Sequence, residues 1–128
     1  VHLGFKISLK TVEMNDMLAA ADYISLHIPS LDKAILGKDE FSKMRDGVII
    51  INCSRGGTID EDALLEALNS GKVAAAGLDV FENEPTPRKD LLTHPRISLT
   101  PHIGASTEEA QNKIGEELAQ KMIAALKG

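Results

Sequence analysis

Three short segments of the sequence carry polar side chains suited to acid–base or anion-binding chemistry, and each directly follows an apolar run. They are Asn52-Cys53-Ser54-Arg55-Gly56-Gly57, the stretch from Asp79 to Glu84, and Pro101-His102-Ile103-Gly104. In open parallel sheets, ligands bind at the carboxyl ends of the strands, because loops and helix N-termini gather there. We therefore expect these segments to form a ligand-binding cleft.

Arg55 is the candidate anion-binding residue. The two glycines that follow it allow a tight turn and the close approach of a ligand. Its guanidinium could then hold a carboxylate with two parallel hydrogen bonds. The competing interpretation is a surface arginine paired with Asp60 or Glu61, and the glycines favour the binding role.

His102 is the candidate proton-transfer residue, because an imidazole changes charge near neutral pH and this one shares the predicted edge with an acidic loop. A neighbouring carboxylate would favour the protonated ring and fix its tautomer, and Glu84 and Glu82 are the candidates. The alternative is a core histidine satisfied by a backbone carbonyl, which is the commoner fate. For Glu82 we favour a solvated loop charge.

Four other residues are titratable groups with a possible role at this edge. An unpaired buried carboxylate is costly, so Asp79 should face the cleft or accept hydrogen bonds from a cofactor. Cys53 should pack beside the cleft, because no base is assigned to activate it. His94, in a loop before a proline, and His2, near the first residue, are expected to play no part in the chemistry.

The composition limits the class of partner. The chain has 128 residues, of which 43% are hydrophobic, with a formal net charge of -5. One domain with one core is expected, and an acidic surface disfavours nucleic acid and anionic membranes as partners. A single cysteine offers neither a disulfide nor a metal-ligand cluster, so no metal and a reducing, cytoplasmic location are expected. No apolar run approaches the roughly 20 residues of a membrane helix.

Four aliphatic runs predict the strands that position these residues, over 23–28, 48–51, 73–78 and 97–100. None alternates polar and apolar residues along its full length, which is typical of parallel strands covered on both faces. Helices are predicted over 14–21, 39–44, 60–71 and 106–128. Their predicted caps are Asn15 or Asp16 for the first, Asp60 and Gly71 for the third, and a capping box of Ser106 and Glu109 for the fourth.

This alternation predicts an α/β fold, a partial Rossmann-type doubly wound parallel sheet with a long amphipathic C-terminal helix. Residues 3–9 could form a further strand, yet no glycine-rich turn follows them. None of the ten glycines gives the G-x-G-x-x-G spacing of a dinucleotide-phosphate turn. The predicted sheet therefore starts in the middle of a doubly wound unit, which the resemblance described below assigns to the second half of a dinucleotide-binding domain.

Four ordered segments resemble the D-isomer-specific 2-hydroxyacid dehydrogenase family, and most of all its D-3-phosphoglycerate dehydrogenases. They are ADYISLHIP (21–29), GVIIINCSRGGTIDEDALLEAL (47–68), AAGLDVFENEP (75–85) and LTPHIGASTEEAQ (99–111). The TPHIGAST stretch resembles the phosphoglycerate branch in particular. The resemblance covers nearly everything from about residue 12 onward.

The resemblance implies a catalytic set that coincides with the cleft residues: Arg55 binds the substrate carboxylate, His102 is the general acid/base, and Glu84 pairs with it. The implied reaction is oxidation of 3-phospho-D-glycerate to 3-phosphooxypyruvate on the route to L-serine, with NAD taking the hydride. The NAD contacts implied by the family are Ile28, Pro29, Cys53, Ser54, Arg55, Asp79, His102, Gly104 and Ala105.

The resemblance also divides the chain, with residues 1–105 as the C-terminal part of an NAD-binding domain and 106–128 as a helix returning toward a substrate domain. Because the glycine-rich unit and the substrate domain are not in the sequence, we expect a truncated chain that alone binds NAD weakly or not at all and has no turnover. The unpartnered sheet edge and the apolar side of the last helix would favour self-association. For the full-length protein a homo-oligomer is expected.

Several alternatives stay open at this point. A dinucleotide-binding corepressor-like module would have the same fold and could keep the same three residues. Another 2-hydroxyacid dehydrogenase, acting on glycerate, glyoxylate or D-lactate, is a second alternative, and the choice between NAD and NADP is also open. A fragment that merely folds or assembles is the third.

Overall fold

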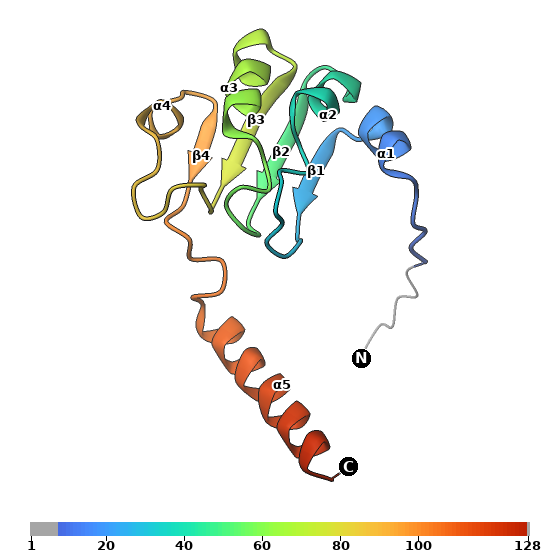
Figure 1. The fold of residues 1–128 in the computed structure, drawn as a ribbon, viewed down its shortest axis with the longest axis vertical. Coiled ribbons are helices and arrows are strands. Elements are labelled where there is room, and N and C mark those ends of the chain that lie inside the picture. The colour runs from blue at the N-terminus through green and yellow to red at the C-terminus, as the bar shows by residue number, and fades with distance from the viewer. Residues whose placement is uncertain (1–7, 128) are drawn as a thin grey trace, which may run out of the picture.

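The computed structural model describes residues 8–127, and at its centre lies a four-stranded sheet in the order β1-β2-β3-β4 (Figure 1). The strands are β1 (Tyr23–Leu26), β2 (Val48–Asn52), β3 (Val73–Leu78) and β4 (Ile97–Leu99). Every neighbouring pair is parallel. The predicted α/β fold with a partial Rossmann-type sheet is confirmed, and each of the four aliphatic runs forms a strand. Most of the strand predicted over residues 3–9 lies outside the described residues.

Five helices lie within the described residues: α1 (Met14–Ala20), α2 (Lys38–Lys43), α3 (Glu61–Ser70), α4 (Lys89–Leu92) and α5 (Glu108–Lys127). The caps predicted for α3 are confirmed. The Asp60 carboxylate accepts a hydrogen bond from the Ala63 N–H at 2.9 Å, and Gly71 ends the helix in the left-handed conformation with φ of 81°. The short helix α4, of four residues, was not predicted.

The caps predicted for the other two helices were wrong. α1 begins after Glu13, whose carbonyl accepts the Met17 N–H, so Asn15 and Asp16 lie inside the helix. At the start of α5 the hydroxyl of Thr107 accepts the Ala110 N–H at 3.1 Å. Ser106 is excluded from that role because it belongs to the preceding turn, where its N–H donates to the Ile103 carbonyl.

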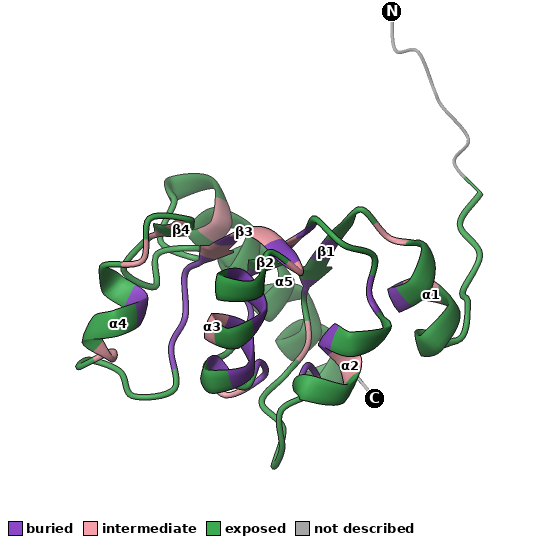
Figure 2. Cartoon of the chain, turned by 90° about the horizontal axis from the view of Figure 1, so that it is seen from above, coloured by how far each residue is buried: buried purple, intermediate pink, exposed green. Residues whose placement is uncertain are grey.

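Helices α1 to α4 lie on one side of the sheet, and the hydrophobic core fills the space between them (Figure 2). The largest fully buried side chains include Leu18, Ile50, Leu64, Leu68 and Leu91. In the described part of the chain the opposite face of the sheet carries no helix, so Tyr23 is 71% exposed. The prediction that both faces are covered is therefore not met here. Several outward positions, such as Ile49 and Ile51, are apolar as in a covered sheet, which is why the sequence pattern suggested one.

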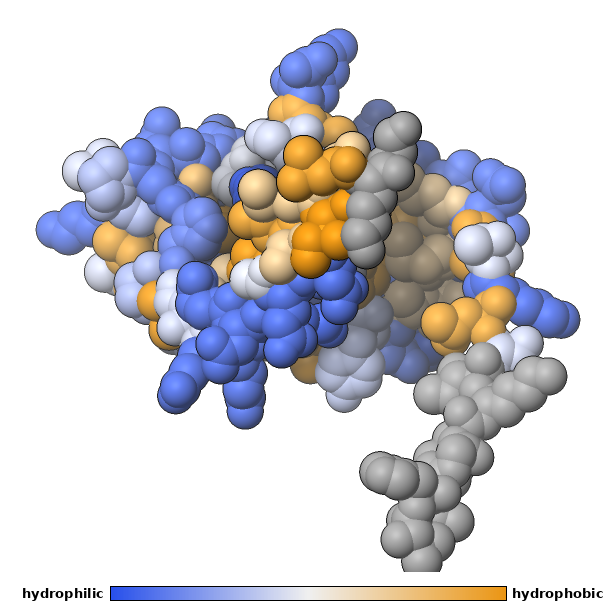
Figure 3. Space-filling model, turned by 90° about the horizontal axis from the view of Figure 1, so that it is seen from below, coloured by the Kyte–Doolittle hydropathy of each residue, from blue (hydrophilic) through white to orange (hydrophobic). Residues whose placement is uncertain are grey.

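Helix α5 extends away from the sheet (Figure 1). Its apolar side chains gather along one side and are at least half exposed (Figure 3); they are Ile114, Leu118, Met122, Ile123 and Leu126. The amphipathic pattern read from the sequence is thus present, and self-association through this side of the helix stays a prediction. Among residues 8–127, no helix has the length and apolar character needed to span a membrane.

The parallel strands bring their carboxyl ends to the same edge of the sheet (Figure 1). Four connections leave from that edge, and three of them carry the polar segments: residues 52–58 after β2, which we call the Arg55 loop; residues 79–85 after β3, the Glu84 loop; and residues 100–104 after β4, the His102 turn. The three polar segments of the sequence are therefore neighbours in space, as the topology of a parallel sheet requires.

Candidate active site

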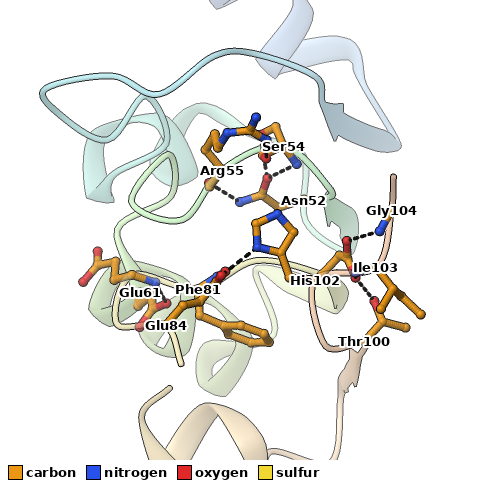
Figure 4. A network of polar contacts seen from close by, with 12 residues as sticks. Asn52, Ser54, Arg55, Glu61, Phe81, Glu84, Thr100, His102, Ile103 and Gly104 are labelled. Atoms are coloured by element: carbon orange, nitrogen blue, oxygen red, sulfur yellow. Dashed lines mark hydrogen bonds and ion pairs between the residues drawn. The ribbon is translucent and has the colours of Figure 1, made fainter. Parts of the chain in front are cut away.

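A carboxylate–imidazole pair joins the Glu84 loop to the His102 turn (Figure 4). Nδ1 of His102 lies 2.6 Å from Oε2 of Glu84, and the two side chains are 45% and 33% exposed. The hydrogen bond with His102 is the main cause that lowers the pKa of Glu84, and the Phe81 N–H adds to it. The alternative of a core histidine bonded to a backbone carbonyl is therefore not met. Of the two candidate carboxylates, Glu84 is the partner of His102, and Glu82 is exposed.

Each oxygen of Glu84 has its own partner. Oε2 faces the imidazole, and Oε1 accepts the backbone N–H of Phe81 at 2.9 Å. A carboxylate held at both oxygens cannot rotate freely, so it presents a fixed acceptor to Nδ1 of His102. With a proton on Nδ1, the other ring nitrogen, Nε2, is the one that can exchange a proton with a ligand.

His102 has an unusual backbone conformation, with φ of 53°. A residue with a β-carbon reaches this left-handed region at a cost of about 1–2 kcal/mol relative to the right-handed one. Such conformations persist only where the surrounding contacts hold them, and they gather at functional sites. The positive φ thus falls on the histidine itself and not on the nearby Gly104.

Asp79 supplies those contacts. Its carboxylate accepts hydrogen bonds from the Thr100 hydroxyl at 2.5 Å, the Ile103 N–H at 2.9 Å and the Gly104 N–H at 2.8 Å. Burial acts to raise the pKa of Asp79, but these three hydrogen bonds outweigh it and the pKa is lowered. Asp79, which is 3% exposed, thus holds the His102 turn in place through these three hydrogen bonds.

The Arg55 loop is organised by Asn52, which is 3% exposed. Its Oδ1 accepts both the N–H and the hydroxyl of Ser54, at 3.1 and 2.8 Å, while its Nδ2 donates to the Thr58 hydroxyl at 3.0 Å. The Thr58 hydroxyl donates in turn to the carbonyl of Arg55 at 2.7 Å. Neither Asn52 nor Thr58 was singled out in the sequence, although an asparagine two residues before a serine at a strand end is a signal for such a turn.

The guanidinium of Arg55 remains available at the rim of the site. Nη1 donates to the neighbouring Ser54 carbonyl at 2.6 Å, and the residue is exposed. Within the described residues it forms no salt bridge with Asp60 or Glu61, so the competing interpretation of this arginine is not supported. A single local hydrogen bond is easily exchanged for a bidentate one to a carboxylate.

The Arg55 loop and the Glu84 loop are in direct contact. A β-carbon built on Gly56 would lie 1.8 Å from the carbonyl oxygen of Phe81, so only glycine allows the two backbones to approach this closely. Because Phe81 also donates its N–H to Glu84, this contact fixes the position of the anion-binding candidate relative to the acid–base pair.

The remaining predicted cofactor contacts lie at the same edge, with their side chains disposed differently. Pro29, Cys53 and Ala105 are exposed and Ile28 is half-buried. Cys53 is thus not packed beside the cleft as predicted, because β2 has ended and the side chain faces outward. The polar atoms of Ser54 and Asp79 are engaged in internal hydrogen bonds.

Of the two histidines set aside in the sequence, His94 lies away from the site. Nδ1 of His94 accepts the Arg96 N–H at 3.2 Å, which is a local turn contact. His2 lies outside the described residues.

A pocket of about 380 Å³ opens beside the carboxylate–imidazole pair. Most of its lining is apolar, with Glu84 and His102 as its ionisable members; the other lining residues are Phe81, Pro85, Pro87, Leu92, Leu99, Thr100 and Pro101. A mostly apolar pocket with a few convergent polar groups is the usual form of a small-molecule site. Its walls come from loop prolines and from α4, which the sequence pattern did not predict.

Comparison with known proteins identifies the class of protein that carries this fold and edge. Residues 5–104 match the model of the family described as "D-isomer specific 2-hydroxyacid dehydrogenase, NAD binding domain". The chain therefore belongs to the D-isomer-specific 2-hydroxyacid dehydrogenase family, and NAD is the cofactor of the matched domain.

Particular relatives fall into more than one activity group. The chain is 46% identical to the D-3-phosphoglycerate dehydrogenase of Archaeoglobus fulgidus, across 96% of this chain and 24% of that protein. It is 48% identical to the hydroxypyruvate reductase of Thermotoga maritima, across 91% of this chain and 40% of that protein. Among solved structures, a glyoxylate reductase from Paecilomyes thermophila matches with a TM-score of 0.79 and 44% identity, across 89% of this chain and 35% of that one. The chain thus spans less than half the length of these relatives.

Proposed function

We propose that this chain supplies the acid–base group and the substrate-carboxylate ligand of an NAD-dependent D-2-hydroxyacid dehydrogenase, with 3-phospho-D-glycerate as the substrate. The observation that carries the proposal is the pairing of Glu84 with His102 at 2.6 Å, at the sheet edge that also carries Arg55. An oriented imidazole and a free guanidinium are the two groups that oxidation of a 2-hydroxy acid requires from the protein.

Arg55 binds the carboxylate of the substrate. Its guanidinium exchanges the bond to the Ser54 carbonyl for two parallel hydrogen bonds to the carboxylate oxygens. Because Asn52 and Thr58 fix the backbone on either side, the arginine turns about its side-chain bonds while the loop stays in place. The substrate is thereby oriented with its 2-hydroxyl toward the imidazole.

His102 accepts the proton of the 2-hydroxyl at Nε2. A bound NAD would supply the hydride acceptor, so the substrate, which gives one proton to Nε2 and one hydride from C2, would become the 2-oxo acid. Glu84 stabilises the imidazolium that results and keeps the proton on Nδ1 throughout. In the reducing direction the same Nε2 returns the proton to the carbonyl oxygen of the oxo acid.

The choice of 3-phosphoglycerate rests on similarity: several of the relatives are named D-3-phosphoglycerate dehydrogenases, and TPHIGAST resembles that branch. A second candidate is reduction of hydroxypyruvate or glyoxylate, favoured by the 48% identity to the Thermotoga maritima hydroxypyruvate reductase. The two candidate activities are distinguished by kcat/KM, measured for 3-phosphoglycerate with NAD and for glyoxylate and hydroxypyruvate with NADH. The measurement is made on a longer protein that contains this chain. A preference for the unphosphorylated acids would overturn the phosphoglycerate assignment.

The catalytic proposal is tested most directly in a chimera. The matched segment of the Archaeoglobus fulgidus enzyme is replaced by this chain, and oxidation of 3-phosphoglycerate is followed by NADH absorbance. We expect turnover that His102→Asn lowers by about 10²–10⁴-fold in kcat. A chimera that binds NADH and turns over equally well with His102→Asn would show that His102 is not the proton-transfer group.

For the 128-residue chain alone we propose weak NAD binding and no turnover, because none of its ten glycines gives the G-x-G-x-x-G spacing that holds the pyrophosphate. Titration calorimetry of NAD into the chain should give a dissociation constant above about 1 mM. Micromolar binding would mean that the strand-end contacts suffice.

A further inference from the structure

Glu61 is a buried carboxyl that the mechanism does not use. It is the first residue of α3, it is 6% exposed, and its Oε1 accepts the backbone N–H of Glu82 at 2.9 Å. Its second oxygen, Oε2, is buried and has no hydrogen-bond partner in the described part of the chain. A glutamate with a half-satisfied carboxyl in a buried position is costly, and an apolar residue of similar size would usually fit better.

The hydrogen bond between Glu61 and the Glu82 N–H lies where it can hold the Glu84 loop. Glu82 lies in the Glu84 loop, between Phe81, whose N–H is accepted by Glu84, and Glu84 itself. The loop is thus held by Gly56 against the Phe81 carbonyl and by Glu61 at the next N–H along the chain. Glu61 connects α3, a rigid element packed on β3, to the loop that carries the partner of His102.

We propose that Glu61 is a positioning residue for the acid–base pair, holding the Glu84 loop through the Glu82 N–H so that Glu84 meets His102 in the geometry described. It acts through Glu84 and touches neither substrate nor cofactor. Its value for catalysis rests on the proposed dehydrogenase function, but its effect on the Glu84 loop does not. Burial raises the pKa of Glu61, which agrees with its enclosed position.

Two variants separate the acceptor from the volume of the side chain. Glu61→Met keeps a similar volume and removes the acceptor, whereas Glu61→Gln keeps an oxygen that can accept the Glu82 N–H. Leu68→Val, on the same helix and fully buried, serves as a control that lowers stability without touching the loop.

The readouts come from NMR on the 128-residue chain and need no turnover. In the unmodified chain the Glu82 amide should be protected from hydrogen exchange. In Glu61→Met it should exchange roughly tenfold faster or more, and the pKa of Glu84 should rise toward its ordinary value because its bonds to His102 and Phe81 loosen. Glu61→Gln and Leu68→Val should leave the pKa of Glu84 unchanged.

Two results would overturn the inference: an unprotected Glu82 amide in the unmodified chain, whatever the variants do, or an unchanged Glu84 pKa in Glu61→Met. In the chimera, Glu61→Met should lower kcat by about tenfold with little change in KM, and Glu61→Gln should restore it. If the chimera shows no turnover at all, the proposed function fails while the NMR result still decides the role of Glu61.

Discussion

Gly56 and the carbonyl group of Phe81 touch so closely that a β-carbon at position 56 would lie 1.8 Å from the oxygen and 2.4 Å from the carbonyl carbon. Only the absence of a side chain at position 56 allows the two backbones to come this close. The loop that carries the arginine we assign to the substrate carboxylate therefore packs directly against the loop that carries the glutamate we assign to the imidazole.

Gly56→Ala should consequently push the Arg55 loop and the Glu84 loop apart. We expect a loss of about 1–3 kcal/mol in the free energy of unfolding, as for other overpacked sites, together with a rise in the pKa of Glu84 as its bond to His102 lengthens. Urea denaturation and carboxyl NMR measure the two effects. Gly77→Ala in β3 is the control, because its β-carbon would meet Ile51 Cγ1 at 4.0 Å, an ordinary contact. Equal stability of the two variants would contradict the close approach.

Asp79→Asn should loosen the His102 turn without altering the core. An amide can offer one oxygen to the N–H groups of Ile103 and Gly104, and its NH₂ group would then face a donor. A buried donor left without an acceptor costs about 1–3 kcal/mol. Faster hydrogen exchange at Ile103 and Gly104 would report the loosened turn. The exposed Asp32→Asn is the control and should change neither the exchange nor the stability.

The same carboxylate makes stability depend on pH. Because the pKa of Asp79 is lower in the folded chain than in the unfolded one, its contribution is fully present above the unfolded pKa and is lost as pH falls through the folded pKa. The stability difference between the unmodified chain and Asp79→Asn should therefore be constant above about pH 5 and shrink below about pH 4. Urea denaturation at several pH values checks this. A difference that stays constant down to pH 3 would mean that Asp79 has an ordinary pKa.

His102 should break the usual ranking of small substitutions. Glycine normally destabilises a chain relative to alanine, because it has more freedom to lose on folding. At φ of 53° the order reverses, since alanine carries the cost of the left-handed conformation and glycine does not. We expect His102→Gly to be more stable than His102→Ala by about 1 kcal/mol. If the alanine variant is the more stable one by thermal or urea denaturation, the turn does not hold this backbone conformation.

The sequence predicted the elements that depend on local pattern. Aliphatic runs gave the four strands of the parallel sheet, and Asp60 and Gly71 marked both ends of α3, because capping and left-handed termination depend on residues within one turn. The grouping of Arg55, Glu84 and His102 at one edge also followed, since parallel strands align their carboxyl ends. These are consequences of chain geometry that need no knowledge of packing.

The contacts that hold the site were not predictable in the same way. Asp79 accepts N–H groups that lie 24 and 25 positions further along the chain, and Glu61 accepts one that lies 21 positions further along. No periodicity indicates which backbone N–H a buried carboxylate will meet, because that depends on how the loops settle against one another. The cap of α5 was misplaced for a related reason: Ser106 and Thr107 are chemically alike, and the preceding turn decided between them.

Glu84 binds the Phe81 N–H with one oxygen and the imidazole with the other, so loop conformation and protonation are thermodynamically linked. Reciprocity then follows without further assumption. A ligand that prefers the Glu84 loop in the arrangement described here must also shift the proton equilibrium of the Glu84 carboxyl, and a change in that protonation must alter the affinity for the ligand by the same factor. Substrate binding at such a site would therefore change the affinity of Glu84 for its proton before any bond to carbon is broken.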